Sequence, residues 1–200
     1  MGTALRQPEN LDMSPTRAFT FVRHGQTDWN LEGRMQGHTD IPLNATGIEQ
    51  AHAAAKRLTS GSFTRIIASP LSRARITAEI IAAAHNLPLE LCDQLKERTF
   101  GSLEGELRDE IRRKHMLGED QDFNSILPAD AEQWPQTQLR SQQAIAKWLS
   151  AYPEENILFV GHGAFFRALY EALGGPYMEA RNATPYHFQP TASGWQLTTL

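Results

Sequence analysis

Three short apolar runs in this chain each stop abruptly at a group of polar residues. The runs cover residues 19–22, 64–68 and 156–160, and they are followed by Arg23 and His24, by residues 69–75 and by residues 161–163. Short apolar runs bounded in this way are typical of buried strands. Helical patterns separate the runs, which favours a sheet of mainly parallel strands with helices on both faces. Because such strands end at one edge of the sheet, the three polar groups are expected to meet there.

The remaining pattern predicts a three-layer α/β/α sandwich with a mainly parallel central sheet. Thr46 and Glu49 form a capping box at the start of a helix that Gly61 is expected to end. Further helices are predicted after residue 75, over 106–115 and 137–151, and between Gly163 and Gly174. Residues 87–91 are a short strand, 184–189 and 195–199 a terminal hairpin, and 31–42 an irregular loop that wraps a site.

Length and composition suit one compact domain. The chain has 200 residues, of which 40% are hydrophobic and 21% charged, enough for a substantial core. Residues 1–17 are polar and interrupted by Pro8 and Pro15, and we interpret them as a flexible lead-in to a single domain over 18–200. Within that domain the pattern is weakest over about 102–134, which predicts a small cover segment.

The overall charge restricts the kind of partner. A net charge of −4 offers no general attraction to nucleic acid or to an anionic membrane, so we expect neither as a partner. Cys92 is the single cysteine, and no signal peptide or membrane span is visible, which together predict a cytoplasmic protein. The oligomeric state stays open, with a homodimer as one option.

The three polar groups predict a local anion site on this acidic protein. Two histidines and at least two arginines at one sheet edge would form a pocket rich in positive charge and hydrogen-bond donors. Phosphate suits such a pocket best, because its oxygens accept paired hydrogen bonds from arginine and are favoured at helix N-termini. The chain lacks a cluster of His, Cys, Asp and Glu at metal-ligand spacing, so no metal and no other cofactor is expected.

Five motifs, in order, are similar to those of the histidine phosphatase superfamily, the phosphoglycerate-mutase-like proteins. They run from about residue 19 to the C-terminus and read RHGQTDWN (23–30), GRMQGHTDIPL (33–43), SPLSRARITA (69–78), LKERTFGSLEG (95–105) and GHG (161–163). Each motif alone is weak, and their order makes the resemblance specific. Leu103 stands where the family often has an aromatic residue, and Ala164 where it often has a second glycine. Both departures would reshape the pocket wall rather than the catalytic groups.

The resemblance also implies roles for individual residues. It makes His24 the nucleophile that becomes phosphorylated and Glu97 the proton donor. Its implied phosphate and substrate ligands are Arg23, Asn30, Gln36, Gly37, Arg73, His162 and the adjoining Gly163.

Plainer interpretations stand beside these roles. His162 would instead be a structural histidine between tight glycines, and Glu97 a solvated charge beside Lys96 and Arg98. Arg75 is expected to be a surface or supporting residue. The basic run over 112–114 is either a solvated helix face or a contact for an anionic substrate tail.

The chemistry explains the residue types independently of any family. A neutral imidazole can attack phosphorus and form a phosphohistidine, which divides one difficult displacement into two easier ones. Arginines placed in advance hold the charge of the transferred group. A carboxylic acid can protonate the leaving oxygen and, as carboxylate, activate the water of the second step.

Three functions from different classes follow. The first is a phosphomonoesterase acting on a small phosphorylated metabolite, the second a cofactor-dependent phosphoglycerate mutase, and the third a non-catalytic binder of phosphorylated ligands. A binder would need neither the nucleophile nor the acid. A mutase must keep water away from its phosphohistidine, and the resemblance implies a longer insertion in mutases than the 64 residues between Glu97 and His162. The sequence therefore favours the phosphatase and leaves its natural substrate open.

Overall fold

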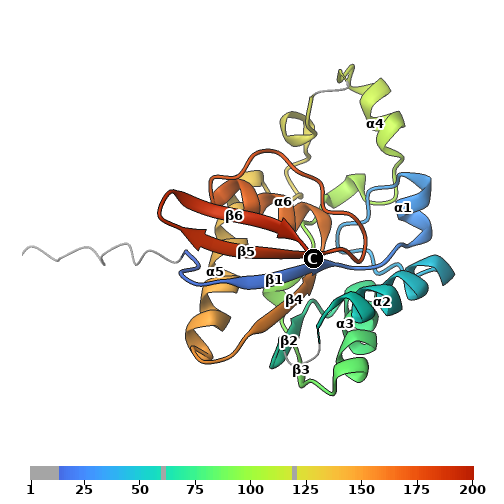
Figure 1. The fold of residues 1–200 in the computed structure, drawn as a ribbon. Coiled ribbons are helices and arrows are strands. Elements are labelled where there is room, and N and C mark those ends of the chain that lie inside the picture. Colours follow the sequence, from blue (N-terminus) through green and yellow to red (C-terminus); the bar gives the residue numbers. More distant parts are fainter. Residues whose placement is uncertain (1–13, 60–61, 119–120) are drawn as a thin grey trace, which may run out of the picture.

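The computed structural model describes residues 14–59, 62–118 and 121–200 (Figure 1). In that part of the chain the strands are β1 (Phe19–Arg23), β2 (Arg65–Ala68), β3 (Leu89–Leu91), β4 (Ile157–Gly161), β5 (Pro185–Thr191) and β6 (Gly194–Thr199). The α-helices are α1 (Asp28–Glu32), α2 (Ala45–Arg57), α3 (Ser72–His85), α4 (Arg108–Lys114), α5 (Trp134–Ala151) and α6 (Gly163–Ala172). Three short 3-10 helices are η1 (Asp93–Leu95), η2 (Gly101–Leu103) and η3 (Asn124–Ile126).

The described strands form one sheet in the order β3-β2-β4-β1-β5-β6. The first four strands are parallel, while β5 is antiparallel to β1 and forms the predicted terminal hairpin with β6. In the register, Val160 of β4 lies beside both Ala68 of β2 and Val22 of β1, and Arg23 lies beside Gly161. The carboxyl ends of β1, β2 and β4 are therefore aligned, as the sequence predicted.

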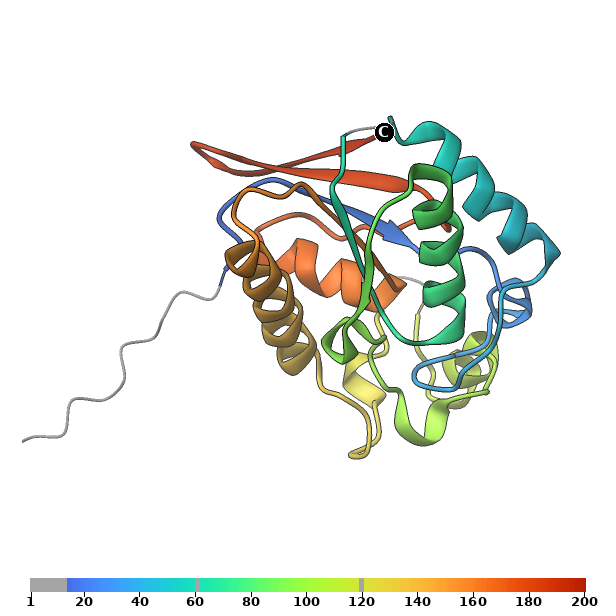
Figure 2. The ribbon, with the colours of Figure 1, turned by 90° about the horizontal axis from the view of Figure 1, so that it is seen from below.

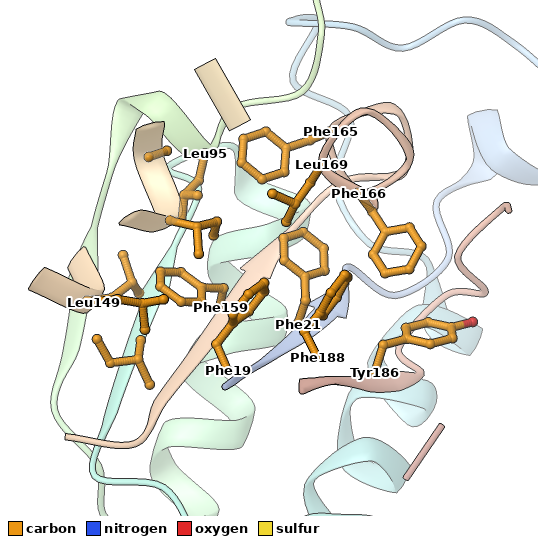
Figure 3. Close-up of a cluster of buried hydrophobic side chains, with 14 of the residues drawn as sticks. Phe19, Phe21, Leu95, Leu149, Phe159, Phe165, Phe166, Leu169, Tyr186 and Phe188 are labelled. Carbon is orange, nitrogen blue, oxygen red and sulfur yellow. The ribbon is translucent and has the colours of Figure 1, made fainter. Parts of the chain in front are cut away.

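Helices cover both faces of the sheet, which confirms the predicted α/β/α layers. Figures 1 and 2 show α2 and α3 together on one side and α5 and α6 on the other. Alternate strand residues supply the two cores, since Phe159 packs toward α5 and α6 while Leu158 and Val160 pack toward α2 and α3. The α5 and α6 side is aromatic, as Figure 3 shows: Phe19 stacks on Phe188 with ring centroids 4.6 Å apart. Full burial of each such ring stabilises the fold by about 1.5–3 kcal/mol.

Three local predictions were wrong. The α2 helix is capped by Asn44, whose side-chain oxygen accepts from the Gly47 N–H at 2.9 Å, and not by Thr46. Asn is among the best N-cap residues, and here it begins the helix two residues before Thr46. The irregular loop predicted over 31–42 begins inside a helix, because Thr27 and Asn30 form a capping box that starts α1, which runs to Glu32. The α2 helix also ends at Arg57, four residues before the predicted end at Gly61, and Gly61 itself lies outside the described residues.

The predicted cover segment is a separate small layer beside α1. The Met35 N–H donates to the Glu106 carbonyl at 3.0 Å, and the Arg108 N–H donates to the Gly33 carbonyl at 2.9 Å. A small cluster of buried side chains, namely Met35, Phe100, Leu103 and Ile111, holds the segment together. In both ribbon views α4 lies beside α1 and away from the central sheet. Its position places it over the carboxyl edge of the strands.

Arg17, the last residue of the predicted lead-in, is tied to the end of α5. Its guanidinium donates to the carbonyls of Leu149, Tyr152 and Glu155 at 3.2, 2.6 and 2.7 Å. These bonds satisfy carbonyls at the helix end that have no partner within the helix. No helix in the described ranges is long and apolar enough to cross a membrane.

Candidate active site

The aligned ends of β1, β2 and β4 bring two histidines together. His24 follows β1 directly and His162 follows β4, and their ring centroids lie 5.2 Å apart. Both side chains are buried, with exposed fractions of 2% and 0%. The histidine side chains that the sequence placed at one sheet edge are therefore in contact, although 138 residues separate them in the chain.

The His24 ring is held in one orientation. Its Nδ1 lies 2.7 Å from the carbonyl oxygen of Gly25. A carbonyl only accepts hydrogen bonds, so Nδ1 carries the proton in the neutral ring and Nε2 keeps its lone pair. Burial, followed by the charges of Arg73 and Arg23, holds the pKa of His24 well below 6.5. The ring is therefore a neutral imidazole with an available Nε2 at physiological pH.

Gly25 is required for packing behind the histidine. A Cβ at this position would lie 2.3 Å from the carbonyl oxygen of Gly47, in the first turn of α2. The Gly25 N–H donates to the Thr77 hydroxyl at 3.0 Å, and that hydroxyl donates to the Arg73 carbonyl at 2.8 Å. The glycine after His24 thus lets the chain pass close to α2 and links the loop after β1 to α3.

Two predicted phosphate ligands lie beside His24, of which Arg73 is buried and Arg23 is half-buried. Arg23 donates from Nη1 to the Ala180 carbonyl at 2.8 Å, and Arg73 donates to the carbonyls of Gly37 and Thr39 at 2.7 and 2.9 Å. Burial lowers the pKa of both guanidinium groups, and the charge of Glu97 opposes this shift. The Nε of each is buried with no partner among the described residues. Both therefore have hydrogen-bonding capacity left for an anion.

His162 is held by Ser69, the residue that follows β2. Its Nε2 lies 2.7 Å from the Ser69 hydroxyl, and its Nδ1 is buried without a partner in the described chain. Burial and the charges of Arg73 and Arg23 place its pKa well below 6.5. His162 is not among the described residues that line the cavity. It contacts His24, which does line the cavity. Its predicted role as a phosphate ligand stays a prediction.

The Glu97 side chain lies against the first turn of α6. One carboxylate oxygen accepts from the backbone N–H groups of Phe165 and Arg98 at 2.9 and 3.0 Å, and the other accepts from the Ala164 N–H at 3.0 Å. The N–H groups of Ala164 and Phe165 are unpaired donors at the N-terminus of α6. Glu97 is 9% exposed and lines the same cavity as His24. The interpretation of Glu97 as a solvated surface charge is therefore wrong.

The loop with Gln36 and Gly37 is anchored to the cover segment by Glu104. The Glu104 carboxylate accepts from the backbone N–H groups of His38 and Thr39 at 3.0 Å and from the Thr39 hydroxyl at 2.7 Å. Burial raises its pKa, but these hydrogen bonds outweigh burial and lower it overall. Gly37 has a φ of +52°, and a Cβ there would lie 2.0 Å from a Glu104 oxygen. Through its bond to Gly37, Arg73 depends on this anchor.

The cavity at this edge has a volume of about 750 Å³. It is lined by the predicted residues Arg23, His24, Asn30, Gln36, Gly37, Arg73, Glu97 and Gly163. Asn30 uses its side-chain oxygen to accept from the Thr27 N–H at 3.1 Å. Of the described residues that line the cavity, seven are arginines and four are acidic. The locally cationic pocket expected from the sequence is therefore present.

The sequence did not single out several cavity residues. These are Arg34, Met35, Arg98, Phe100, Arg108, Asp109, Gln121, Asp122, Phe123, Arg167, Tyr177, Glu179 and Ala180. Arg167 lies one helical turn after Gly163, a spacing that would have placed both on one face of α6. Arg112 also lines the cavity, which fits the interpretation of the basic run as a contact for an anionic substrate tail, whereas Arg75 pairs with Glu79 at the surface. Within the described ranges, no group of three or more His, Cys, Asp or Glu residues has the arrangement of a metal site.

Comparison with known proteins agrees with this geometry. The model of the histidine phosphatase superfamily (branch 1) matches residues 19–200. An uncharacterized phosphatase, PhoE, of Bacillus subtilis is 39% identical over 158 residues, which cover 79% of this chain and 78% of that protein. A probable phosphoglycerate mutase, GpmB, of Enterobacter sp. is 35% identical over 191 residues, 87% of each chain.

A solved structure shows the same fold. The phosphoserine phosphatase of Entamoeba histolytica, in complex with 3-phosphoglyceric acid, superimposes with a TM-score of 0.76 and 29% identity. The match covers 92% of this chain and 95% of that one.

Proposed function

The chain belongs to the histidine phosphatase superfamily, and from this membership we propose that it is a phosphomonoesterase acting on a small phosphorylated metabolite through a phosphohistidine on His24. The carrying observation is the His24 ring, whose Nδ1 is bound to the Gly25 carbonyl. Its Nε2 is left with a lone pair in a cavity that also contains Arg23, Arg73 and Glu97.

In the first step the lone pair of His24 Nε2 forms a bond to phosphorus while the ester P–O bond breaks. The leaving oxygen takes the proton of the Glu97 carboxylic acid. Arg23 and Arg73 hold the charge of the phosphoryl oxygens, which costs no reorganisation because both guanidinium groups are already fixed by backbone carbonyls.

In the second step the Glu97 carboxylate takes a proton from water as the water oxygen attacks phosphorus. The N–P bond breaks, its electron pair returns to Nε2, and inorganic phosphate leaves. Glu97 is then protonated and His24 neutral, so both groups are ready for another cycle. The hydrogen bonds from the start of α6 hold the carboxylate in place through both steps.

A phosphoglycerate mutase is the alternative, supported by the similarity to GpmB. The two reactions share the first step and differ in the acceptor of the phosphoryl group. Hydrolysis is favoured by the modest cover, whose one described α-helix, α4, has seven residues. A mutase needs an elaborate lid that excludes water.

The decisive experiment follows the phosphoryl group. Brief mixing with a labelled phosphomonoester should label His24 in a form that is stable in base and lost in acid, and His24→Ala should carry no label. With 3-phosphoglycerate and a little 2,3-bisphosphoglycerate, we expect inorganic phosphate and little 2-phosphoglycerate. Label on Ser or Asp would overturn the mechanism, and isomerisation faster than phosphate release would identify a mutase.

A further inference from the structure

A second pair of arginines lines the cavity, apart from Arg23 and Arg73. Arg98 follows Glu97, and Arg167 lies on α6. Their guanidinium carbons lie 5.0 and 4.2 Å from the ring centre of Trp134, the first residue of α5. Since α5 and α6 pack on the same face of the sheet (Figure 2), these two cations of the cavity lining converge on one aromatic ring.

Arg98 is fully buried and incompletely bonded. Its Nε donates to the Glu132 carbonyl and its Nη1 to the Asn124 side-chain oxygen, both at 2.6 Å, and both acceptors are uncharged. Its Nη2 has no partner among the described residues. Burial, followed by the charge of Arg167, lowers the pKa of Arg98 to about 10. A bound anion would relieve both the burial and the repulsion.

The carboxylates near this pair are engaged elsewhere. Glu171 lies 3.7 Å from the Arg167 Nε and accepts from the Trp134 indole N–H at 2.9 Å. Asp122 accepts from Asn124 at 2.9 and 2.7 Å. Glu97 accepts from backbone N–H groups with both oxygens, as described above. Glu132, whose charge also acts on Arg98, pairs with Arg140 at 2.6 Å. Among the described residues, Glu171 is therefore the one carboxylate that forms an ion pair within 4 Å with either arginine, at the wall of a cavity large enough for much more than phosphate.

We propose that Arg98 and Arg167 bind a second anionic group of the substrate, a carboxylate or another phosphate, while the reacting phosphoryl group lies at His24. This inference rests on the proposed function and narrows it. The substrate class becomes phosphomonoesters that carry a further negative charge.

The test uses ester pairs that differ in the second anion alone. 3-Phosphoglycerate and glycerol 3-phosphate differ by a carboxylate in place of a hydroxymethyl group, and fructose 1,6-bisphosphate and fructose 6-phosphate differ by a phosphate. In one pair, we expect kcat/KM to be at least about tenfold higher for the ester that carries two anionic groups than for the ester that carries one. This is the usual effect of a charge-assisted hydrogen bond. The pair that shows the preference identifies the second anion.

Arg167→Gln is the test variant because its side chain makes fewer structural bonds than Arg98. This variant should bring the ratio of kcat/KM within the ester pair close to one. Arg167→Lys, which retains the charge, should keep part of the preference. Arg75→Gln is the matched control, since Arg75 pairs with Glu79 at the surface of α3 and is not among the described residues that line the cavity. It should leave the preference unchanged. Equal kcat/KM for both members of both pairs, or a preference that survives Arg167→Gln, would refute the proposal.

Calorimetry separates this proposal from the proposed function. Titration of 3-phosphoglycerate and of glycerol 3-phosphate, and of the two fructose phosphates, into the His24→Ala protein measures binding without turnover. If no ester is hydrolysed by the unmodified protein, the phosphatase assignment fails, while tighter binding of a doubly anionic ligand that Arg167→Gln abolishes still supports the anion site. Equal binding within both pairs would refute the site whatever the enzyme assays show.

Discussion

The Nε2 of His162 lies 2.7 Å from the hydroxyl of Ser69. The side chain that orients this histidine therefore comes from the residue after β2, the strand beside β4. Because a hydroxyl can either donate or accept, this contact fixes the direction of the His162 ring and not the nitrogen that carries its proton. Ser69 is therefore a positioning residue for His162, and His162 in turn contacts His24.

Ser69→Ala should lower kcat by about 10- to 100-fold, the range expected when a catalytic ring loses its orientation. KM should change little, because Ser69 itself is not among the described residues that line the cavity. The nitrogen chemical shift of His162 Nε2 should change, because this atom loses its hydrogen-bond partner. The control is Ser141→Ala, which removes the hydroxyl of a different buried serine, on α5. It should leave kcat and the His162 chemical shifts unchanged. An unchanged kcat in Ser69→Ala would contradict the positioning role.

Glu97→Gln should slow the hydrolysis of alkyl phosphates by on the order of 10²–10⁴, the usual reach of general acid catalysis. Aryl esters should lose less, because a nitrophenolate leaves without a proton. Phosphorylation of His24 would then stay fast and its hydrolysis slow, which rapid mixing should record as a burst. Equal losses for both ester classes without a burst would exclude Glu97 as the acid and point to the other acidic residues among the described lining of the cavity, namely Asp109, Asp122 and Glu179.

Glu104→Gln should weaken the anchor of the loop over residues 36–39. The amide nitrogen cannot accept the backbone N–H bonds that one carboxylate oxygen now receives, and a lost bond to a charged group costs about 1.5–3 kcal/mol. We expect urea unfolding to show a loss of that size. Activity should fall as well, because Arg73 donates to the Gly37 carbonyl. Glu110→Gln, at an exposed position on α4, should change neither stability nor activity.

The pKa of His24 should lie well below 6.5, and NMR titration of its ring measures it directly. Burial and the adjacent positive charges disfavour the imidazolium ion. As the pH falls below 6.5 the unfolded chain takes up the proton before the folded protein does, so His24 lowers stability over that interval. Arg73→Gln removes one of the charges and should raise the pKa of His24. Titration of His24 at or above 6.5 in the folded protein would contradict this account.

Removal of divalent metal should leave the rate nearly unchanged. Arg23 and Arg73 supply the positive charge at the reacting phosphoryl group in the proposed mechanism, so no metal ion has that task. The measurement is steady-state phosphate release before and after exhaustive chelation. A loss of activity that added Mg²⁺ or Zn²⁺ restores would overturn the arginine assignment.

The sequence predicted the sheet and its reactive edge because strand burial is a local pattern. Residues 19–22 and 156–160 are continuous apolar runs, as expected for strands covered on both faces, and the polar residues directly after them mark where burial ends. His24, Arg23 and His162 could be placed at one edge from this pattern and from the parallel order alone.

Tertiary structure decided which side chains complete the site, because those contacts join segments that carry no mutual signal along the chain. Glu97 becomes fixed only when α6 presents its free N–H groups, 67 residues away for Ala164. Arg98 and Arg167 form a pair only because the α5 residue Trp134 lies against both. The start of α2 also depends on contacts outside the helix, since the Asn44 side-chain amide donates hydrogen bonds to the side chains of Gln26 and Asp28, close to His24 in the chain. Periodicity in a sequence reports which residues are buried, whereas the partner of each buried polar group depends on how the layers pack.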